Sequence, residues 1–440
     1  MPCGNAIFME ESTEKNEKNN FDKPKTLTFP SGFLWGTATS SHQVEGNCKN
    51  NWTAWEKENA QRLANEAKGK WQDWQQEKFP EMFDPQNYIS GRTCDHYNKF
   101  EEDFDLTKEM GNNAHRFSLE WSRIEPEEGK FDEKEIEHYR QVILALRKRG
   151  IEPFITLWHW TDPVWFQEFG GWTNKKSVAC FERFTKKIVE SLKKDVKFWI
   201  LVNEPNVGLG FGHFLGSQPP GKKGPINFLK AYFNLLKSYK KVYLAIHEID
   251  KKAQVGFAHS FAPYESDIFW PIGKLIVFIG EYFSKYFVRK NEGCFDFIGC
   301  NYYLRHVVSL KKKTFSKENT SDLGWEIYPK GIYDTLIRLK KYNLPVYITE
   351  NGIADATDEK RGKFIKNHLQ FIYQAISEGI DVRGYFHWSL MDNFEFPDTR
   401  GFWPRFGLIE IDFETLERKP RRSFYEYAKI CQKNAVEIKN

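Results

Sequence analysis

The stretch FWILVNEPNV, residues 198–207, indicates which architecture the chain adopts. It begins as a run of large apolar residues and ends abruptly on Asn203, Glu204 and Pro205. A second run, LPVYITENG at residues 344–352, is also β-branched and aromatic, and it places Glu350 before Asn-Gly. Such runs are typical of strands buried on both faces, as in parallel sheets.

Eight runs of this kind occur along the chain, separated by amphipathic stretches such as residues 101–111 and 135–150. The predicted strands span residues 33–40, 114–124, 152–160, 198–205, 254–260, 295–303, 345–352 and 384–393. Strands that alternate with helices form parallel βα units. Eight such units predict an α/β fold, a single-domain (β/α)8 TIM barrel with long βα loops at the C-terminal face of the barrel.

The domain organisation follows from composition along the chain. Residues 1–25 are rich in Lys, Glu and Asn and are predicted to be a mobile N-terminal tail, so that the barrel domain spans residues 26–440. Residues 48–95 are an insertion after the first predicted strand, expected to form a long loop with helical pieces over one barrel end. Residues 262–294 are expected either to form an apolar helix used in self-association or only to cover the barrel.

Composition argues against several classes of protein. The aromatic content of 16% is too high for a disordered chain, and a net charge of +4 without a basic run predicts no nucleic-acid partner. Seven scattered cysteines, with no Cys-x-x-Cys pair, predict neither a disulfide framework nor a zinc site. The N-terminus lacks the apolar core of a signal peptide, and no apolar stretch is long enough to span a bilayer. A cytoplasmic protein without a membrane partner is therefore expected.

Polar and aromatic side chains gather at the ends of the predicted strands. In a barrel of this type the active site lies at the C-terminal ends of the strands. Taken singly, each such residue is more often structural, because a Glu before Pro or before Asn-Gly commonly just ends a strand. Their shared position at one end of the barrel favours a site. The residues concerned are Arg116, Glu120, His159, Trp160, Asn203, Glu204, Asn301, Tyr303, Glu350, Trp388, Asp392 and Glu395.

Glu204 and Glu350 are the candidate catalytic pair. They end the fourth and seventh predicted strands, which stand three places apart on a ring of eight, so their carboxyl groups could approach to about 5 Å, the separation found in retaining glycosidases. Burial and a neighbouring carboxylate would raise the pKa of one of them, while Arg116 and Tyr303 would keep the other ionised. Spacing alone does not say which glutamate has which role.

Several long motifs resemble glycoside hydrolase family 1, the β-glucosidases, β-galactosidases and their relatives. The motifs occur in order between Phe29 and Tyr427 and include FPSGFLWGTATSSHQVEG, TLWHWTDPVWF, NEPN, DFIGCNYY, DLGWEIYP, ITENG and WSLMDNFE. The resemblance implies a (β/α)8 barrel that hydrolyses the nonreducing terminal sugar of a small β-glycoside or oligosaccharide by retaining double displacement. It also implies that neither a cofactor nor a metal is needed.

The resemblance assigns roles to individual residues. It implies that Glu204 is the general acid/base, that Glu350 is the nucleophile, and that Arg116 and Tyr303 support the nucleophile. Indole faces and polar side chains suit a pyranose ring and its hydroxyls. By motif, the residues that bind the substrate are Gln43, His159, Asn203 and Glu395 for the hydroxyls, Trp388 under the ring, and Trp325 at the leaving-group site.

Two departures from the family bear on specificity. Phe396 follows the Glu of DNFE where the family usually has Trp, and Phe cannot donate a hydrogen bond to the sugar. The following loop, residues 396–400, is also longer than usual. We therefore expect a broad preference among β-glucosides, β-galactosides and β-fucosides. Pro404 and Phe406 stand where phosphosugar enzymes of the family have Lys and Tyr, so no phosphosugar preference is expected.

Two alternatives stay open at this point. A transglycosylase would share every residue named above, and only product analysis separates it from a hydrolase. A non-catalytic sugar-binding barrel would usually lack one or both glutamates, whereas both are present here. The glycine-rich stretch GLGFGHFLG, residues 208–216, is no dinucleotide motif, because His213 or Leu215 stands where that motif needs glycine. The sequence leaves a homo-oligomer open.

Overall fold

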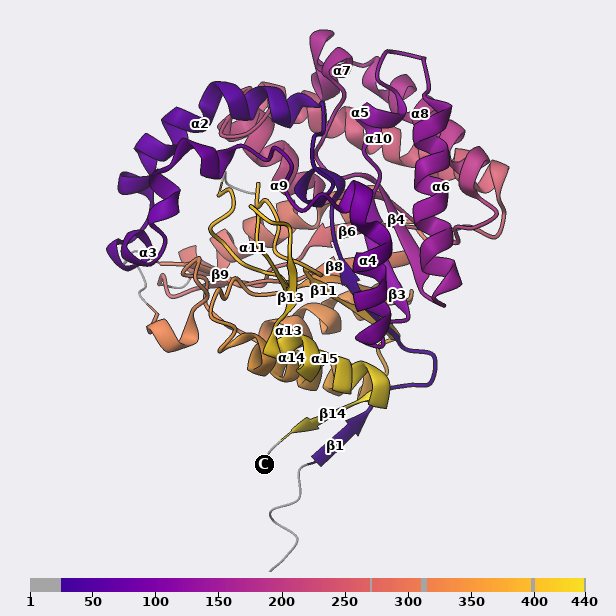
Figure 1. Ribbon diagram of the computed structural model, residues 1–440. Helices are drawn as coiled ribbons and strands as arrows, with labels where there is room; N and C mark the ends of the chain where they lie inside the picture. The colour runs from indigo at the N-terminus through magenta and orange to yellow at the C-terminus, as the bar shows by residue number, and fades with distance from the viewer. Residues whose placement is uncertain (1–24, 270, 310–314, 397–399, 439–440) are drawn as a thin grey trace, which may run out of the picture.

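The computed structural model describes residues 25–269, 271–309, 315–396 and 400–438. The predicted tail lies outside the described residues, apart from Lys25, which begins strand β1. Eight parallel strands close into a barrel within a shell of helices (Figure 1). In barrel order they are β2 (Leu34–Ala38), β3 (Ala114–Ser118), β4 (Glu152–Trp158), β5 (Phe198–Asn203), β6 (Gln254–Ser260), β8 (Phe297–Asn301), β10 (Val346–Asn351) and β11 (Val382–Trp388). The predicted (β/α)8 TIM barrel is confirmed.

Two of the predicted strands end at least five residues earlier than expected. The run at residues 114–124 is a strand only to Ser118, and Trp121–Ile124 form the short helix α5. The cause is Glu120, whose side chain accepts a hydrogen bond from the backbone N–H of Ser122 and so caps this helix. The last strand, expected at residues 384–393, is β11 and ends at Trp388.

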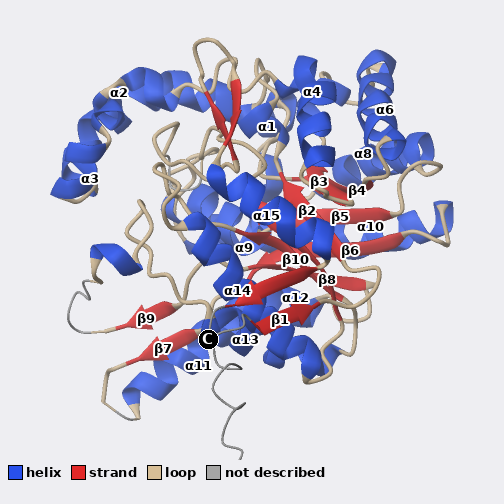
Figure 2. Cartoon of the chain, turned by 60° about the horizontal axis from the view of Figure 1, so that its bottom comes forward, coloured by secondary structure: helices blue, strands red, loops and turns tan. Residues whose placement is uncertain are grey.

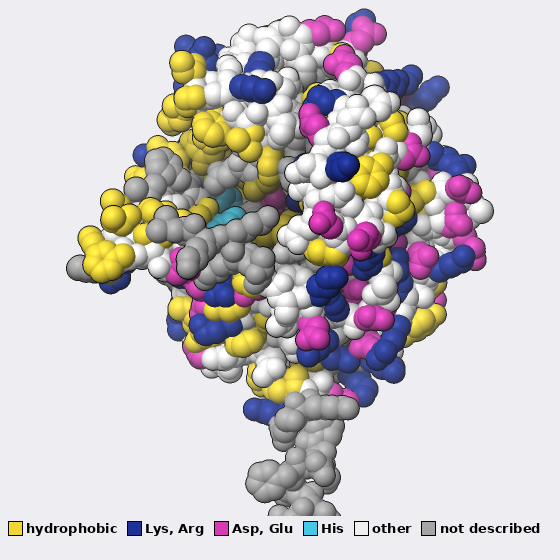
Figure 3. Space-filling view, turned by 90° about the vertical axis from the view of Figure 1, so that its left-hand side faces the viewer, with side chains coloured by type: hydrophobic (Ala, Val, Ile, Leu, Met, Phe, Trp, Pro, Cys, Tyr) yellow, Lys and Arg dark blue, Asp and Glu magenta, His cyan; other side chains and the backbone are white. Residues whose placement is uncertain are grey.

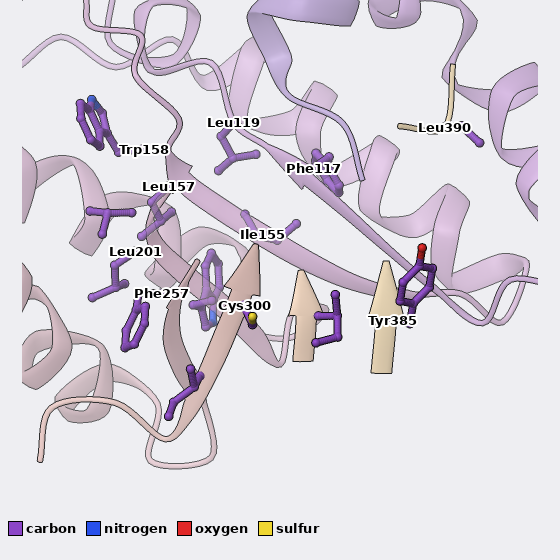
Figure 4. Close-up of a cluster of buried hydrophobic side chains, with 14 of the residues drawn as sticks. Phe117, Leu119, Ile155, Leu157, Trp158, Leu201, Phe257, Cys300, Tyr385 and Leu390 are labelled. Carbon is purple, nitrogen blue, oxygen red and sulfur yellow. The ribbon is translucent and has the colours of Figure 1, made fainter. Parts of the chain in front are cut away.

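The barrel strands are apolar on both faces because their residues alternate between two cores. In β4, Ile155 and Leu157 belong to the layer between barrel and helices, whereas Phe154 belongs to the barrel interior. Figure 4 shows part of the outer layer, including Ile155, Leu157, Leu201 and Phe257. This double burial explains why the strands read as continuous apolar runs.

Aromatic rings fill the barrel interior. Phe154 stacks on Phe198 with ring centroids 4.1 Å apart, and it meets the rings of Tyr347 and Phe386 edge-on at 5.2 and 4.9 Å. Phe154, Phe198 and Tyr347 lie near the starts of their strands. The interior is therefore packed at the N-terminal end, and a ligand can enter only from the opposite end.

Eight longer helices form most of the outer shell (Figure 2). They are α4 (His96–Glu109), α6 (Glu133–Lys148), α8 (Ser177–Leu192), α10 (Pro225–Ile249), α11 (Ile272–Ser284), α13 (Lys330–Leu339), α14 (Arg361–Ser377) and α15 (Arg422–Lys433). Helices α4 and α6 confirm the helical stretches expected around residues 101–111 and 135–150. In α8 the buried residues Phe181, Phe184 and Ile188 recur at helical spacing, so that one face packs on the barrel.

The insertion at residues 48–95 contains helical pieces, as predicted. They are α2 (Asn51–Lys70), α3 (Asp73–Lys78), η1 (Pro80–Phe83) and η2 (Pro85–Tyr88). Helix α2 begins after Asn50, whose side-chain oxygen accepts from the N–H groups of Trp52 and Thr53, both at 3.0 Å. Gln75 donates to the backbone carbonyl of Asp322 at 2.7 Å, which ties the insertion to the loop after β8.

The two ends of the described chain meet below the barrel. Strand β1 (Lys25–Thr28) pairs antiparallel with β14 (Ala435–Ile438), as Figure 1 shows. The shorter elements are α1 (Ser41–Val44), α5 (Trp121–Ile124), α7 (Val164–Glu168), η3 (Gly171–Thr173), α9 (Pro205–Leu209), η4 (Gly210–Leu215), β7 (Tyr264–Ser266), α12 (Tyr286–Lys290), β9 (His306–Val308), η5 (Lys317–Asn319), η6 (Lys340–Tyr342), β12 (Ile409–Ile411) and β13 (Arg418–Pro420). Across the described residues, no helix has the length and apolarity needed to cross a membrane.

Candidate active site

Glu204 lies at the point where β5 ends. Its backbone has φ 40° and ψ 59°, in the left-handed region, and Pro205 then starts helix α9 as its first residue. Proline suits this first position because it needs no N–H donor there. A left-handed residue other than glycine costs about 1–3 kcal/mol, and such residues gather at functional sites. The Glu-Pro pair thus turns the chain sharply from strand to helix at the barrel mouth.

Glu350 is held by two donors. It lies in β10, and its Oε1 accepts from Nη1 of Arg116 at 2.5 Å, while its Oε2 accepts from the Tyr303 hydroxyl at 2.7 Å. The Arg116 guanidinium is fully buried behind it. A permanently charged donor and a phenol together hold this carboxylate in one orientation.

A chain of hydrogen bonds joins the two glutamates. Nη2 of Arg116 donates to Oδ1 of Asn203 at 2.8 Å, and Nδ2 of Asn301 donates to the same oxygen at 3.1 Å. Nδ2 of Asn301 also lies 2.9 Å from Oε1 of Glu204. Side chains from β3, β5 and β8 therefore fix the position of one glutamate relative to the other.

The surroundings of Glu204 favour its protonated form. Burial, followed by the negative charge of Glu350, raises its pKa to about 8, although the hydrogen bond from Asn301 and the charge of Arg116 act in the opposite direction. At neutral pH the Glu204 carboxyl group is therefore an acid that still holds its proton.

Both glutamates face one cavity at the C-terminal end of the barrel, with a volume of about 450 Å³. The face that carries this end of the barrel is hollowed, with hydrophobic side chains beside the hollow and a histidine visible inside it (Figure 3). The predicted residues that line the cavity are Gln43, His159, Asn203, Glu204, Tyr303, Trp325, Glu350, Trp388 and Glu395. Nine of the eleven residues predicted to catalyse the reaction, support the nucleophile or bind the substrate therefore line one cavity.

His159 lines the cavity as a neutral ring. Oδ1 of Asn203 already accepts two hydrogen bonds, so its Nδ2 donates to Nε2 of His159 at 3.1 Å. Burial and the charge of Arg116 hold the pKa of His159 well below its usual value, so the ring is neutral and carries its proton on Nδ1. That Nδ1 is buried and has no hydrogen-bond partner among the described residues.

Gln43 and Glu395 are positioned by neighbouring groups. Nε2 of Gln43 donates to Oδ1 of Asn393 and to the Phe394 carbonyl, both at 2.9 Å, so its side chain is fixed. Glu395 accepts from Nε1 of Trp388 at 3.1 Å, and burial raises its pKa to about 7. The cavity therefore offers fixed amide and carboxyl groups around the edge of an indole ring.

Two predicted residues lie behind the cavity wall. Arg116 acts through Glu350 and Asn203, as described above. Phe396 is 1% exposed, and its ring stacks on Trp52 at 4.6 Å. It also packs beside Trp160 at 5.4 Å. Contact between Phe396 and a substrate stays a prediction, and residues 397–399 of the longer loop lie outside the described part of the chain.

Several residues that contribute to the site were assigned no role from the sequence. Asn301 ends β8 and pairs in register with Glu350, so its position at a strand tip was the available signal. Arg400 lines the cavity and lies over the Trp325 ring at 4.8 Å, an arrangement that only the folded loop creates. Val207, Phe211 and Leu215 add an apolar wall after Glu204.

Comparison with known proteins shows the family of the chain. The family model described as glycosyl hydrolase family 1 matches residues 25–267 and 282–436. Beta-glucosidase A of Thermotoga maritima is 32% identical, over 93% of this chain and 99% of that protein. Beta-galactosidase of Pyrococcus woesei is 29% identical, over 93% of this chain and 98% of that protein.

Solved structures show the same fold. The β-glycosidase from Pyrococcus horikoshii superposes with a TM-score of 0.83 at 36% identity, and the match covers 94% of this chain and 97% of that one. A β-glucosidase from Thermotoga maritima in complex with glucoimidazole gives a TM-score of 0.80 at 28% identity, over 93% and 100% of the two chains. The chain therefore belongs to glycosyl hydrolase family 1 and is a glycoside hydrolase related to the β-glucosidases.

Proposed function

We propose that the protein is a retaining β-glycosidase in which Glu350 is the nucleophile and Glu204 is the general acid/base. One observation carries this assignment. The two glutamates face a single cavity but have different surroundings. Glu204 is protonated at neutral pH, whereas Glu350 is paired with Arg116 and Tyr303. Double displacement requires one carboxyl group that donates a proton and one carboxylate that attacks the sugar. In retaining enzymes in general the two carboxyl groups lie about 5 Å apart.

In the first step, a Glu350 oxygen attacks the anomeric carbon of the sugar. The bond to the leaving group breaks while Glu204 transfers its proton to the departing oxygen. This leaves a glycosyl ester on Glu350 and a carboxylate on Glu204. The loss of the negative charge on Glu350 removes one cause of the raised pKa of Glu204, so Glu204 becomes a base suited to the second step.

In the second step, Glu204 removes a proton from water, which attacks the anomeric carbon and releases Glu350. Two inversions restore the β configuration. The Trp388 face would lie under the pyranose, while His159, Asn203, Gln43 and Glu395 would bind its hydroxyls. Relatives named for glucose and for galactose match at similar identity, which supports the broad preference among β-glycosides expected from the sequence.

Two substitutions test the roles. Glu350→Gly is expected to lower kcat by about 10⁴-fold or more, because no group replaces the nucleophile. Glu204→Ala is expected to be slow with water but to be partly restored by azide when the substrate is an activated aryl β-glucoside. The product should then be the β-glycosyl azide, identified by NMR, because azide attacks the glycosyl ester without a general base.

The matched control is Glu127→Ala, because the Glu127 side chain is 68% exposed and pairs with Lys130 on the surface. This variant should retain full activity. Near-normal turnover by Glu350→Gly would overturn the assignment of the nucleophile. An α-glycosyl azide from Glu204→Ala would show that the azide had displaced the leaving group directly and would overturn the double displacement.

A further inference from the structure

One charged side chain in the catalytic cavity has no part in the proposed mechanism. Arg400 lines the cavity and is 6% exposed, so its guanidinium is held inside the protein. Among the described residues that line this cavity, it is the only Lys or Arg. Burial of a cation is costly unless anions or hydrogen-bond acceptors compensate it. A cation at this place therefore bears on which substrates the cavity accepts.

The backbone around Arg400 is fixed by two other segments. The N–H groups of Arg400 and Gly401 donate to the carbonyl of Glu395 at 3.2 and 2.8 Å. Nδ2 of Asn87 donates to the Arg400 carbonyl at 3.0 Å. Gly401 has φ 77°, and a Cβ atom there would stand 2.0 Å from the backbone oxygen of Asn87, so glycine permits this close approach. Arg400 is therefore held at one place beside the cavity.

Arg400 shares one region of the cavity with Glu395 and Trp325. Its Cζ lies 4.8 Å from the centre of the Trp325 ring. Burial raises the pKa of Glu395 to about 7, and the positive charge of Arg400 acts in the opposite direction. The guanidinium and the Glu395 carboxyl group are therefore close enough to act on the same part of a substrate.

The orientation of the sugar would bring its C6 group toward Arg400. With C1 between the two glutamates, one edge of the pyranose carries the C2 and C3 hydroxyls, and the other carries the ring oxygen and C6. His159 and Asn203, at the ends of β4 and β5, are predicted to bind hydroxyls and suit the first edge. Trp325 and Arg400 come from the loops after β8 and β11, further round the barrel, and are left to meet the second edge.

We propose that Arg400 binds a carboxylate at C6 of the sugar, so that the enzyme hydrolyses β-hexuronides, such as β-D-glucuronides, as well as neutral β-glycosides. The inference rests on the proposed function, because the same two glutamates cleave the hexuronide. The planar guanidinium donates two parallel hydrogen bonds to the carboxylate oxygens, which a neutral hydroxymethyl group cannot accept as a pair. Below about pH 7, Glu395 holds its proton and adds no second negative charge beside this carboxylate.

A singly charged group suits this cavity better than a phosphate. One guanidinium carries one positive charge, whereas a phosphate monoester carries about −1.5 to −2 at pH 7. The described part of the lining holds no second Lys or Arg that would balance the remaining charge. Phe406 instead adds an apolar ring to the lining. The charge balance therefore favours a carboxylate.

The inference is tested first with the unmodified enzyme at pH 6, where Glu395 is mostly protonated. The kcat/KM for p-nitrophenyl β-D-glucuronide is compared with that for p-nitrophenyl β-D-glucoside, because the two share one leaving group. The glucuronide value should equal or exceed the glucoside value, and D-glucuronate should inhibit glucoside hydrolysis at least about tenfold more strongly than D-glucose. p-Nitrophenyl 6-phospho-β-D-glucoside, assayed in parallel, should be a poorer substrate than the glucuronide.

Substitution of Arg400 locates the effect. Arg400→Met should lower the ratio of kcat/KM for the glucuronide to that for the glucoside about 10- to 100-fold, because hydrogen bonds to a charged group are lost. Arg400→Lys retains the charge but loses the paired donors, so its ratio should be intermediate. The matched control is Arg289→Met, because Arg289 also lies over an aromatic ring, 3.8 Å from the centre of Tyr282, and does not line the cavity. It should leave the ratio unchanged.

The outcomes are distinguishable. If the glucoside is hydrolysed but the glucuronide has the lower kcat/KM, or the 6-phosphoglucoside is preferred to it, the inference is overturned and the proposed function stands. If no β-glycoside is hydrolysed, both fail. If the glucuronide is a good substrate but Arg400→Met leaves the ratio unchanged, Arg400 does not bind the carboxylate, and the inference is likewise overturned. Should the Arg400 variants fail to fold, inhibition of the unmodified enzyme by D-glucuronate and D-glucose decides the question.

Discussion

The ionisation of Glu204 determines how activity should depend on pH. Its pKa is raised to about 8, so the group keeps its proton, and with it the capacity to act as acid, below that pH. We expect kcat/KM for an alkyl β-glucoside to hold a plateau at neutral pH and to fall above about pH 8, tenfold for each further pH unit. A pH–rate profile of the unmodified enzyme measures this.

A comparison of leaving groups makes the pH prediction specific to Glu204. A dinitrophenyl β-glucoside departs without a proton, so its kcat/KM should fall less above pH 8 than that of an alkyl glucoside. If kcat/KM fell equally above pH 8 for the two substrates, this would instead indicate a general loss of structure or the titration of another group.

Tyr303 is expected to contribute through a single hydrogen bond to Glu350, the proposed nucleophile. Its hydroxyl donates to Oε2 of Glu350 at 2.7 Å. Hydrogen bonds to charged groups contribute about 1.5–3 kcal/mol, so Tyr303→Phe should lower kcat/KM about 10- to 100-fold. The adjacent Tyr302 donates to the backbone carbonyl of Tyr328 instead. Tyr302→Phe should therefore reduce stability but leave kcat/KM nearly unchanged, and equal losses in the two variants would contradict this role for Tyr303.

Asn434 joins several elements where the two ends of the barrel domain meet. Asn434 ends α15 with φ 50°, and its side chain accepts from Nε1 of Trp35 at 2.8 Å and donates to the carbonyl of Phe29 at 2.8 Å. One residue therefore serves three needs: a left-handed turn, a bond to β2, and the start of the β1–β14 pair.

Two substitutions distinguish the contribution of the left-handed turn from that of the side-chain hydrogen bonds. Asn434→Gly retains the left-handed turn but loses both hydrogen bonds, and it should lower the free energy of unfolding by about 1–3 kcal/mol. Asn434→Ala should cost a further 1–2 kcal/mol, roughly, because alanine disfavours positive φ. Urea denaturation measures both. Equal stability of the two variants would show that the turn conformation adds no strain.

Element type was predictable from sequence where a local pattern controls it. β4, β5 and α6 each carry a strong apolar pattern, and all three are present. Element ends were harder to predict, because they depend on groups brought in by folding or by caps. The run at 114–124 is one example, since Glu120 turns its second half into α5. The glycine-rich stretch after Glu204 is another, since Gly210–Leu215 form a π-helix that borders the catalytic cavity.

For the molecule as a whole, the catalytic arrangement carries a cost in stability. The folded state holds the Glu204 carboxyl with a pKa of about 8, above its ordinary value of 4.5. Between these two pH values the folded state binds a proton that the unfolded chain does not. The free energy of unfolding therefore falls as pH rises from 4.5 to 8, and the full cost is present above pH 8.

Glu204→Gln removes this cost, because an amide has no charge to bury. At pH 8.5 the variant should be more stable than the unmodified protein by about 1–4 kcal/mol, and near pH 4 the difference should vanish. Chemical denaturation at both pH values measures it. Glu127→Gln, at the exposed position used above, should show no such pH-dependent gain. A loss of stability in Glu204→Gln at pH 8.5 would contradict the raised pKa.

The sequence alone determined the barrel and its eight strands, and it predicted Glu204 and Glu350 as the catalytic pair. It could do so because double burial imposes continuous apolar runs on the strands, and because a polar residue at the end of such a run can face only the barrel mouth. Tertiary structure decided what surrounds those glutamates. The link through Asn203 and Asn301 and the packing of Phe396 against Trp52 each join side chains from segments distant in the chain. Such contacts depend on packing across the closed barrel, and no local sequence pattern predicts them.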